Sequence, residues 1–360
     1  MMKNKVVIIS QTYPSETNKY AQAFIHPRTK GYIETGLECV VISFSAEEPY
    51  EYDGVKVYPP REGEDILRSW DKPLVVVHAP NVRNQVRFIM KNKHNIGWLI
   101  LFFHGHEVLF EDRIYPKPYA FNKKEMRKYR LAYFYDRVKI PIMKWFIKWS
   151  LRQGCDLVFV SQWMLDETIN ATGLRLVGSE HVHIINNGLN AYIKEGTYVQ
   201  GDVWADFLTI RPFDKSKYSV DLVVELANAN PQYKFHIYGK GEYFKYFKKP
   251  HNVEIIDRFL LPKDMPSVFN HYRCALMPTK ADAQGLMMCE MAVYGMPMIT
   301  SDLAVCHEML DDYSNVRFIG NGDFSKRLEN LPEALSAPVY RFNYSSTIGR
   351  EIEIIKERMS

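Results

Sequence analysis

Short runs of apolar residues alternate with segments of helix length along the first half of the chain. The apolar runs lie at 5–10, 37–44, 53–58, 74–78, 98–103, 156–161 and 183–185. Segments with helical spacing of apolar positions lie between several of them, including 20–35 and 81–93. Buried strands joined by helices are typical of βαβ units, in which helices cover both faces of a parallel sheet.

The same alternation restarts after a more polar stretch. Further strands are predicted at 207–210, 234–238, 253–256 and 275–277, and helices at 220–229 and 263–272. The hydrophobic pattern is weak over 191–204, which contains Gly196 and Gly201. Since 360 residues exceed a usual single core, we predict an α/β fold of two Rossmann-like, doubly wound parallel-sheet domains facing a cleft. Their expected bounds are 1–190 and 205–340, with a linker at 191–204 and a C-terminal helix within 341–360 that packs back on the first domain.

Composition places the chain among soluble or peripheral proteins. Hydrophobic residues make up 46% and charged residues 24%, as in ordinary globular domains. The five cysteines are scattered and form no Cys-x-x-Cys motif, which favours a reducing, cytoplasmic compartment without a zinc site. The longest apolar runs resemble 98–103 in length, too short to span a bilayer.

Positive charge is concentrated in one segment. Residues 115–152 contain eleven Lys or Arg against two acidic residues, a net charge of +9, which leaves −5 for the rest of the chain. Within this segment a helical stripe is predicted to rest on an anionic surface at the inner face of the plasma membrane; it consists of Lys144, Trp145, Lys148, Trp149 and Arg152. The alternative is a core-packing helix with a solvated basic face. Nucleic acid is not a predicted partner, because no groove-reading or RNA-binding motif accompanies the charge.

The stretch from Asp282 to Glu290 combines two acids with a Gly-Leu step between them. The preceding apolar run and the following Gly295 predict a strand, a loop and the start of a helix. Such a loop delivers backbone N–H groups to an anion, and the acids can hold sugar hydroxyls. By itself the spacing is weak, since two acids eight apart occur by chance and Glu near a helix start complements the dipole.

Other polar candidates also follow predicted parallel strands. They are His104, the Asn187-Gly188 pair, Arg211 and Gly239. Ligands of doubly wound sheets bind at the carboxyl ends of the strands, so these residues and the Asp282–Glu290 loop are candidates for one site.

The second half of the chain resembles glycosyltransferase family 4, whose members are retaining enzymes of the GT-B fold. The resemblance rests on Asp282, Gly285-Leu286, Glu290 and the run Gly295-Met296-Pro297-Met298-Ile299. Two positions depart from the family pattern, because Asp282 replaces a Glu and Gln284 replaces an aromatic residue. The resemblance implies transfer of a sugar from a nucleotide-sugar, UDP- or GDP-linked, to a hydroxyl acceptor without a cofactor. A glycan or glycolipid acceptor from lipopolysaccharide or capsule biosynthesis is the expected setting.

The resemblance also implies how the donor diphosphate is bound. Arg211 would contact it with either Lys215 or Lys217, and the amides around Gly285 and Leu286 would stabilise it. The chain contains no Asp-x-Asp motif, so no metal is expected. Fixed cationic side chains would then stabilise the charge that develops on the leaving group.

The remaining donor contacts are implied in the same way. Glu290 would hold the ribose hydroxyls and Asp282 the transferred sugar, so both are candidate catalytic residues together with His104. Gly239, in a Gly-Lys-Gly step after a strand, would lie near the nucleoside.

The acceptor side matches the family less closely. His104 corresponds to a family His near the reacting sugar, and His106 is its rival. Asn187 matches the Asn of a Pro-Asn-Gly turn, although the pair is equally typical of an ordinary turn. The family's Gly-Gly loop is absent, and residues 10–19, with Asn18, stand in its place.

Two other functions remain open. A nucleotide-sugar 2-epimerase on the same scaffold would consume the donor without an acceptor. A non-catalytic module would bind nucleotide or glycan without turnover.

Overall fold

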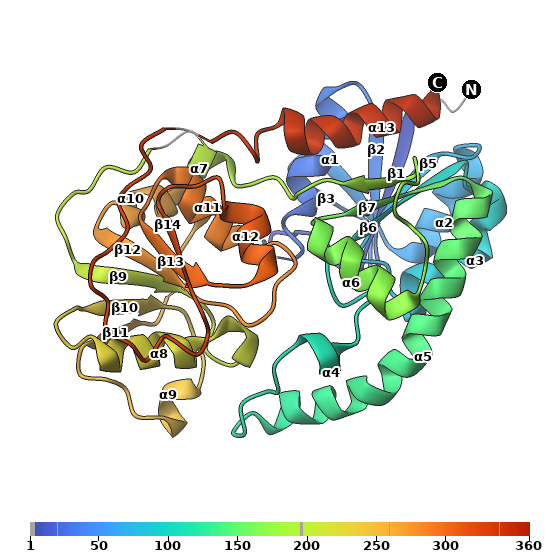
Figure 1. Ribbon diagram of the computed structural model, residues 1–360. Helices are drawn as coiled ribbons and strands as arrows, with labels where there is room; N and C mark the ends of the chain where they lie inside the picture. Colours follow the sequence, from blue (N-terminus) through green and yellow to red (C-terminus); the bar gives the residue numbers. More distant parts are fainter. Residues whose placement is uncertain (1–3, 20, 195–196, 259, 338) are drawn as a thin grey trace. The chain divides into compact units, whose positions relative to one another are not determined.

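The chain folds into two α/β units, each built on its own sheet (Figure 1). The structure is a computed structural model, and it describes residues 4–19, 21–194, 197–258, 260–337 and 339–360. Unit 1 comprises the chain up to Phe110, Tyr135–Gly188 and Phe342–Ser360; unit 2 comprises Glu111–Phe134 and Leu189–Arg341. The predicted domains were continuous pieces of chain, whereas neither unit is.

Among the described residues, unit 1 contains an eight-stranded sheet in the order β3-β4-β2-β1-β5-β6-β7-β8. Its neighbouring strands are parallel except for β3 and β4. The strands are β1 Lys5–Ser10, β2 Glu38–Ser43, β3 Tyr50–Tyr52, β4 Val55–Tyr58, β5 Leu74–His78, β6 Trp98–Phe103, β7 Cys155–Phe159 and β8 Val182–Ile184. The strand order reverses between β1 and β5, and the carboxyl ends at such a reversal are where doubly wound sheets bind ligands.

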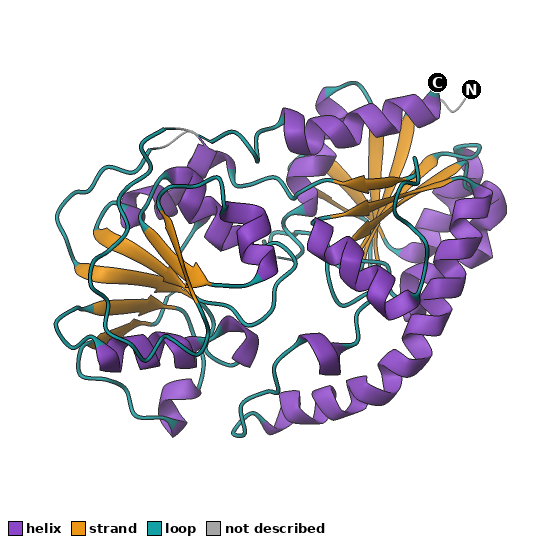
Figure 2. Ribbon diagram, in the orientation of Figure 1, coloured by secondary structure: helices purple, strands orange, loops and turns teal. Residues whose placement is uncertain are grey.

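Helices cover both faces of the unit 1 sheet (Figure 2). They are α1 Ile25–Glu34, α2 Pro60–Ser69, α3 Arg87–Asn92, α6 Gln162–Thr172, α13 Arg350–Met359 and most of α5 Lys123–Gln153. α6 shows local start and stop signals: the Ser161 hydroxyl accepts from Met164 N at 3.0 Å, and Gly173 ends the helix with φ 64°. α2 begins with Pro60 at its first position, where the missing N–H of proline would have no partner within the helix.

The C-terminal helix is built into unit 1. Buried Arg28 on α1 donates from Nε to Glu351 Oε1 on α13 at 2.8 Å and from Nη2 to Asn187 Oδ1 at 2.9 Å. The Tyr32 hydroxyl donates to the other oxygen of Glu351 at 2.5 Å. Around this network α1, α13 and the sheet share one hydrophobic core, which includes Ile8, Ile25, Ile348, Ile352 and Ile355.

In the described part of unit 2, six parallel strands form a sheet in the order β11-β10-β9-β12-β13-β14. They are β9 Ala205–Ile210, β10 Phe235–Tyr238, β11 Val253–Ile256, β12 Tyr272–Met277, β13 Met298–Ser301 and β14 Val316–Ile319. The helices are α4 Glu111–Ile114, α7 Ala191–Lys194, α8 Val220–Ala229, α9 Tyr243–Tyr246, α10 Met265–Phe269, α11 Leu286–Tyr294 and α12 Ala304–Leu310. Here the strand order reverses between β9 and β12.

Residues 111–134 belong to unit 2 because their aromatic side chains pack there. The Tyr119 hydroxyl donates to Asp221 Oδ1 on α8 at 2.9 Å. The Phe121 ring stacks on the Tyr246 ring with 4.7 Å between centroids, and Tyr119 meets Tyr243 edge to face at 5.1 Å. These long-range contacts have no local sequence signal, so the predicted division missed them.

Several element bounds differ from prediction. The helix expected at 20–35 begins at Ile25, and its first residue, Tyr20, lies outside the described residues, as does Gly196 of the expected linker. The helix expected at 263–272 is a 3₁₀ turn, Pro262–Asp264, followed by α10, which ends at Phe269. β12 then begins at Tyr272 rather than 275, because Tyr272 and Cys274 are buried on either side of exposed Arg273.

Candidate functional site

The strand-order reversal in unit 2 brings two predicted segments to the same edge of the sheet. Arg211 follows β9, and its backbone N–H donates to Tyr238 O at 3.0 Å. Gly239, which follows β10, allows this approach: with φ +148°, a Cβ there would lie 2.1 Å from Arg211 O. The structure thus gives Gly239 a packing role that supports the Arg211 backbone.

The Arg211 side chain is a buried cation with unused donors. It is 7% exposed, and its Nε atom is buried without a hydrogen-bond partner among the described residues. Burial lowers its pKa and the nearby Asp282 carboxylate partly opposes this, but an arginine remains charged at neutral pH. A desolvated guanidinium with free N–H groups is equipped to bind an anion.

Of the two candidate lysines, Lys217 lies with Arg211. The Tyr218 ring has the Arg211 guanidinium 5.5 Å from its centroid and the Lys217 ammonium 5.1 Å from it. Lys215 is exposed, and its charge acts on Glu125 of α5. Both cations therefore contact the aromatic ring of Tyr218, a residue that was not predicted from the sequence.

The loop after β12 ends in an uncapped helix. Gly285 is the N-cap of α11 with φ 68°, and no side chain caps the helix. The first amides of a helix, here from Leu286 onward, have no acceptor within it and carry the positive end of its dipole. Asp282 Oδ1 accepts from Ala283 N at 2.8 Å and from Gln284 N at 3.3 Å, which fixes the loop. Asp282 Oδ2 lies 3.6 Å from the position of a Cβ on Gly285, and the Asp282 charge acts on the Arg211 guanidinium, so these three groups are near one another.

Glu290 lies one turn further along α11. Its Oε1 accepts from Asn190 N at 3.2 Å. Burial raises the Glu290 pKa to about 7, and this hydrogen bond opposes the rise. The carboxyl group is therefore poised to change its charge near neutral pH, as is common for groups in functional sites.

In unit 1, His104 follows β6 and lies beside His78, the last residue of β5. His78 Nδ1 and His104 Nε2 are 3.2 Å apart, and the ring of Phe24 lies 4.6 Å from that of His104. Burial and the neighbouring Arg28 lower the pKa of His104 well below its usual value. The rival, His106, has an exposed side chain, and its carbonyl accepts from Lys139 Nζ at 2.6 Å.

The two predicted acceptor-side asparagines differ in their surroundings. Asn18 lies in an exposed turn in which its backbone N–H donates to Ser15 O at 3.1 Å. Asn187 is buried, and its Oδ1 accepts from Arg28. The Asn187 side chain thus belongs to the same network as Glu351.

The predicted membrane stripe is only partly exposed. Trp145 is 51% exposed, and Lys148 and Arg152 are exposed with it. Lys144 and Trp149 are partly buried, and the Trp149 ring stacks on Phe146 with 5.9 Å between centroids. The same helix also exposes apolar residues that were not predicted from the sequence, among them Leu131, Phe134 and Val138.

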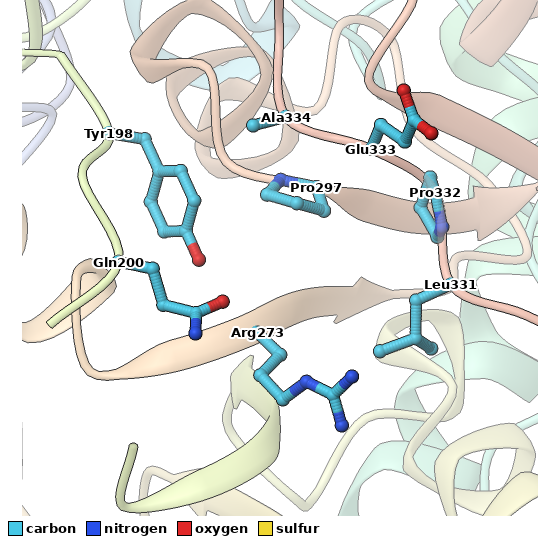
Figure 3. A pocket seen from close by; sticks show the side chains of 8 residues that line it. All are labelled: Tyr198, Gln200, Arg273, Pro297, Leu331, Pro332, Glu333 and Ala334. Carbon is cyan, nitrogen blue, oxygen red and sulfur yellow. The ribbon is translucent and has the colours of Figure 1, made fainter. Parts of the chain in front are cut away.

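A pocket of about 400 Å³ lies elsewhere in unit 2 (Figure 3). Arg273 near the start of β12 and Pro297 just before β13 place it at the amino ends of the strands, opposite Arg211. Tyr198, Gln200 and the run from Leu331 to Ala334 complete its lining. None of the predicted site residues lines it.

In the described ranges no helix has the length and apolarity needed to cross a membrane. In the same ranges no cluster of three or more His, Cys, Asp or Glu side chains is placed to hold a metal ion. All five cysteines are free thiols.

Comparison with known proteins places this site in a recognised domain. Residues 209–335, which include Arg211, Asp282 and Glu290, match the family model described as Glycosyl transferases group 1. The match covers less than half of the chain. No curated protein sequence matches the chain.

Solved structures resemble the fold at low sequence identity. Sucrose-phosphate synthase from Thermosynechococcus elongatus has a TM-score of 0.63 and 9% identity, over 99% of this chain and 94% of that one. WaaG, a glycosyltransferase involved in lipopolysaccharide biosynthesis, has a TM-score of 0.58 and 12% identity, over 89% and 88%. An Escherichia coli structure described as trehalose-6-phosphate bound with UDP-2-fluoro glucose has a TM-score of 0.55 and 10% identity, over 99% and 94%. The chain thus has the two-domain, Rossmann-like GT-B fold. The family match over residues 209–335 supports glycosyltransferase activity.

Proposed function

We propose that this protein is a retaining, metal-independent glycosyltransferase that moves a sugar from a nucleotide-sugar to a hydroxyl acceptor. The observation that carries the proposal is Arg211, a buried guanidinium beside the uncapped start of α11 at the strand-order reversal of unit 2. A diphosphate would satisfy the guanidinium and the free amides together.

The donor would be held by unit 2. Arg211 and Lys217 would contact the diphosphate with the amides from Leu286 onward, whereas the Lys215 side chain is exposed to solvent. Glu290 would accept hydrogen bonds from the ribose hydroxyls, and Asp282 would bind the transferred sugar. In unit 1, His104 would contact a sugar hydroxyl on the acceptor side.

Transfer with retention needs no enzyme nucleophile in this scheme. The bond between the sugar's anomeric carbon and the phosphate oxygen breaks, and the acceptor oxygen bonds to that carbon from the same face. The acceptor's proton passes to the departing phosphate oxygen. Negative charge grows on the diphosphate as the bond breaks, so fixed cations and amides that face it lower the barrier.

A donor panel tests the proposal against its rivals. The protein is incubated with UDP-, GDP- and ADP-sugars, and released nucleotide is measured with and without an acceptor extract. A transferase releases nucleotide at a higher rate when the acceptor is present. A 2-epimerase consumes the donor equally without acceptor, and a binding module releases no nucleotide.

The structural neighbours guide the choice of substrates. One of them was solved with UDP-2-fluoro glucose, and another takes part in lipopolysaccharide biosynthesis. We therefore place UDP-sugars before GDP-sugars in the panel, and glycan or glycolipid acceptors of surface polysaccharides before other hydroxyl compounds. No cofactor is required in this proposal.

Nucleotide affinity should depend on pH through Glu290. Ribose hydroxyls donate to the ionised carboxylate, so the protonated form must lose its proton on binding. Because the free carboxyl has a pKa of about 7, affinity for UDP should fall by about tenfold per pH unit below pH 7 and be level above it. Glu290→Gln should remove this dependence and weaken binding at pH 8 by about 10- to 100-fold. Calorimetric titration measures both effects.

The control for this titration is Glu329→Gln, which replaces an exposed acid of the same unit and should leave the pH dependence intact. If the UDP affinity of the unmodified protein is constant between about pH 5.5 and 8, Glu290 is not part of the nucleotide site.

We also propose that α5 binds an anionic lipid surface. The exposed side chains of Leu131, Phe134, Val138 and Trp145 follow one another at spacings of three, four and seven, which places them on one face of the helix. Exposed cations lie at both ends of this apolar face: Arg127 four residues before Leu131, and Lys148 and Arg152 after Trp145. Apolar insertion flanked by cations suits an anionic bilayer.

Vesicle co-sedimentation tests this surface. Lys148→Gln with Arg152→Gln should weaken binding to phosphatidylglycerol-containing vesicles by about 30-fold, since each basic residue near the surface contributes about 1 kcal/mol. The matched control, Lys72→Gln with Lys93→Gln, removes two exposed charges away from α5 and should bind like the parent. Equal binding of the α5 variant and the parent would reject the proposal. With the free thiols, this surface favours a cytoplasmic enzyme at the inner face of the plasma membrane.

A further inference from the structure

Two histidines at the ends of neighbouring strands in unit 1 form a hydrogen-bonded pair. β5 and β6 are paired in parallel, with His78 opposite Phe102, so their carboxyl ends lie together. His78 Nδ1 lies 3.2 Å from His104 Nε2. His78 is fully buried, whereas His104 is partly exposed and is the residue placed on the acceptor side.

Aromatic side chains and a fixed cation surround the pair. The His78 ring packs against Phe102 at 4.6 Å and against Phe24 at 6.2 Å between centroids. Arg28, held by Glu351, acts on both imidazoles, and with burial it lowers both pKa values. Both rings are therefore neutral, and only one of the two facing nitrogens carries a proton.

The other ring nitrogen of His78, Nε2, indicates whether His78 Nδ1 or His104 Nε2 carries the proton. His78 Nε2 is buried and has no hydrogen-bond partner among the described residues. Proteins rarely leave a buried N–H without an acceptor, and an unused acceptor is tolerated more often. The proton of His78 therefore belongs on Nδ1, which donates to His104 Nε2. Since His104 accepts at Nε2, its own proton is on Nδ1.

The backbone holds His78 in this place. Ala79, the next residue, has φ +53°, a left-handed conformation that is unfavourable for alanine, and its N–H donates to Phe102 O at 3.0 Å. Strained residues of this kind persist where the surrounding structure over-determines them, and they cluster at functional sites.

We propose that His78 is a positioning residue that fixes His104 as its Nδ1–H tautomer. His104 then presents a neutral N–H donor to an oxygen of the bound sugar or acceptor and does not accept the acceptor's proton. The identity of the oxygen that His104 contacts rests on the proposed function. The tautomer of His104 is inferred from the structure without it.

Nitrogen NMR of ¹⁵N-histidine-labelled protein tests the tautomer directly. In the parent at neutral pH, the His104 resonances should be those of an Nδ1–H imidazole. His78→Phe keeps an aromatic ring but removes the donor, so His104 should become a mixture of tautomers. His78→Asn places an amide donor near the position of Nδ1 and should restore the parental spectrum. His94→Phe, at an exposed histidine, is the matched control.

Transfer kinetics give a second readout. His78→Phe should lower kcat/KM about fivefold to tenfold, the loss expected for one misdirected hydrogen bond, and His78→Asn should recover most of it. A parental His104 in the Nε2–H form, or a His104 spectrum unchanged by His78→Phe, would overturn the proposal. Because the spectra need no substrate, an absence of transferase activity would count against the proposed function alone.

Discussion

Replacing Arg211 by alanine should lower kcat/KM for sugar transfer by about 100- to 1000-fold, the usual loss when one donor to a developing negative charge is removed. The Arg211 guanidinium is buried beside Asp282 and the start of α11, so water cannot replace it well. Arg211→Lys should recover only part of the activity, because an ammonium lacks the planar pair of donors that matches a phosphate. Initial rates with the active nucleotide-sugar measure the effect.

The same variant should separate function from stability. Arg211→Ala removes a buried cation that has no ion-pair partner among the described residues, so the free energy of unfolding should stay level or rise. UDP should raise the Tm of the parent but not of the variant, because ligand binding stabilises only the form that binds it. Arg273→Ala is the control, since Arg273 is exposed and paired with Asp206 at 2.9 Å. Full activity of Arg211→Ala would contradict the proposed diphosphate site.

Replacing Glu351 by alanine should lower the free energy of unfolding by about 3–5 kcal/mol, as expected when a buried ion pair loses one partner. The substitution leaves the Arg28 guanidinium buried without its carboxylate and removes the acceptor of the Tyr32 hydroxyl. Urea denaturation of the whole chain, followed by tryptophan fluorescence and circular dichroism, measures the change.

Glu353→Ala on the same helix is the matched control. Its side chain is exposed, so the change in unfolding free energy should stay within about 0.5 kcal/mol. The double variant Arg28→Met with Glu351→Leu should lose less than the two single variants together, because no charge is left unpaired. A Glu351→Ala protein as stable as the parent would show that water reaches Arg28 and that the network does not hold the C-terminal helix.

The fold was largely predictable because its central strands are buried on both faces. Runs such as Leu74–His78 and Trp98–Phe103 are almost entirely apolar, and their bounds match the prediction. Contacts between distant segments were not predictable from local patterns. Arg28 and Glu351 are 323 positions apart, and residues 111–134 pack through aromatic side chains in an otherwise polar stretch.

The candidate site was predictable where chemistry follows a strand directly. Arg211 and the Gly285 helix start were found in this way, and the structure places both at the strand-order reversal. His78 was not found, because it ends an apolar run and is typical of a core histidine there. Spacing alone left Lys215 and Lys217 equally open as phosphate contacts, whereas the contact of Lys217 with the Tyr218 ring favours Lys217 in the proposal.

The path of the chain limits how the protein can be dissected. It passes between the units after Phe110, Phe134, Gly188 and Arg341, so neither unit is encoded by one uninterrupted stretch. A fragment cut near residue 190 would carry 111–134 without the aromatic partners of those residues and would lack the helix that neutralises Arg28. Separately expressed halves would therefore expose apolar surface and a lone buried charge. Isolated pieces of this protein should be designed by joining the segments of one unit, not by trimming the ends.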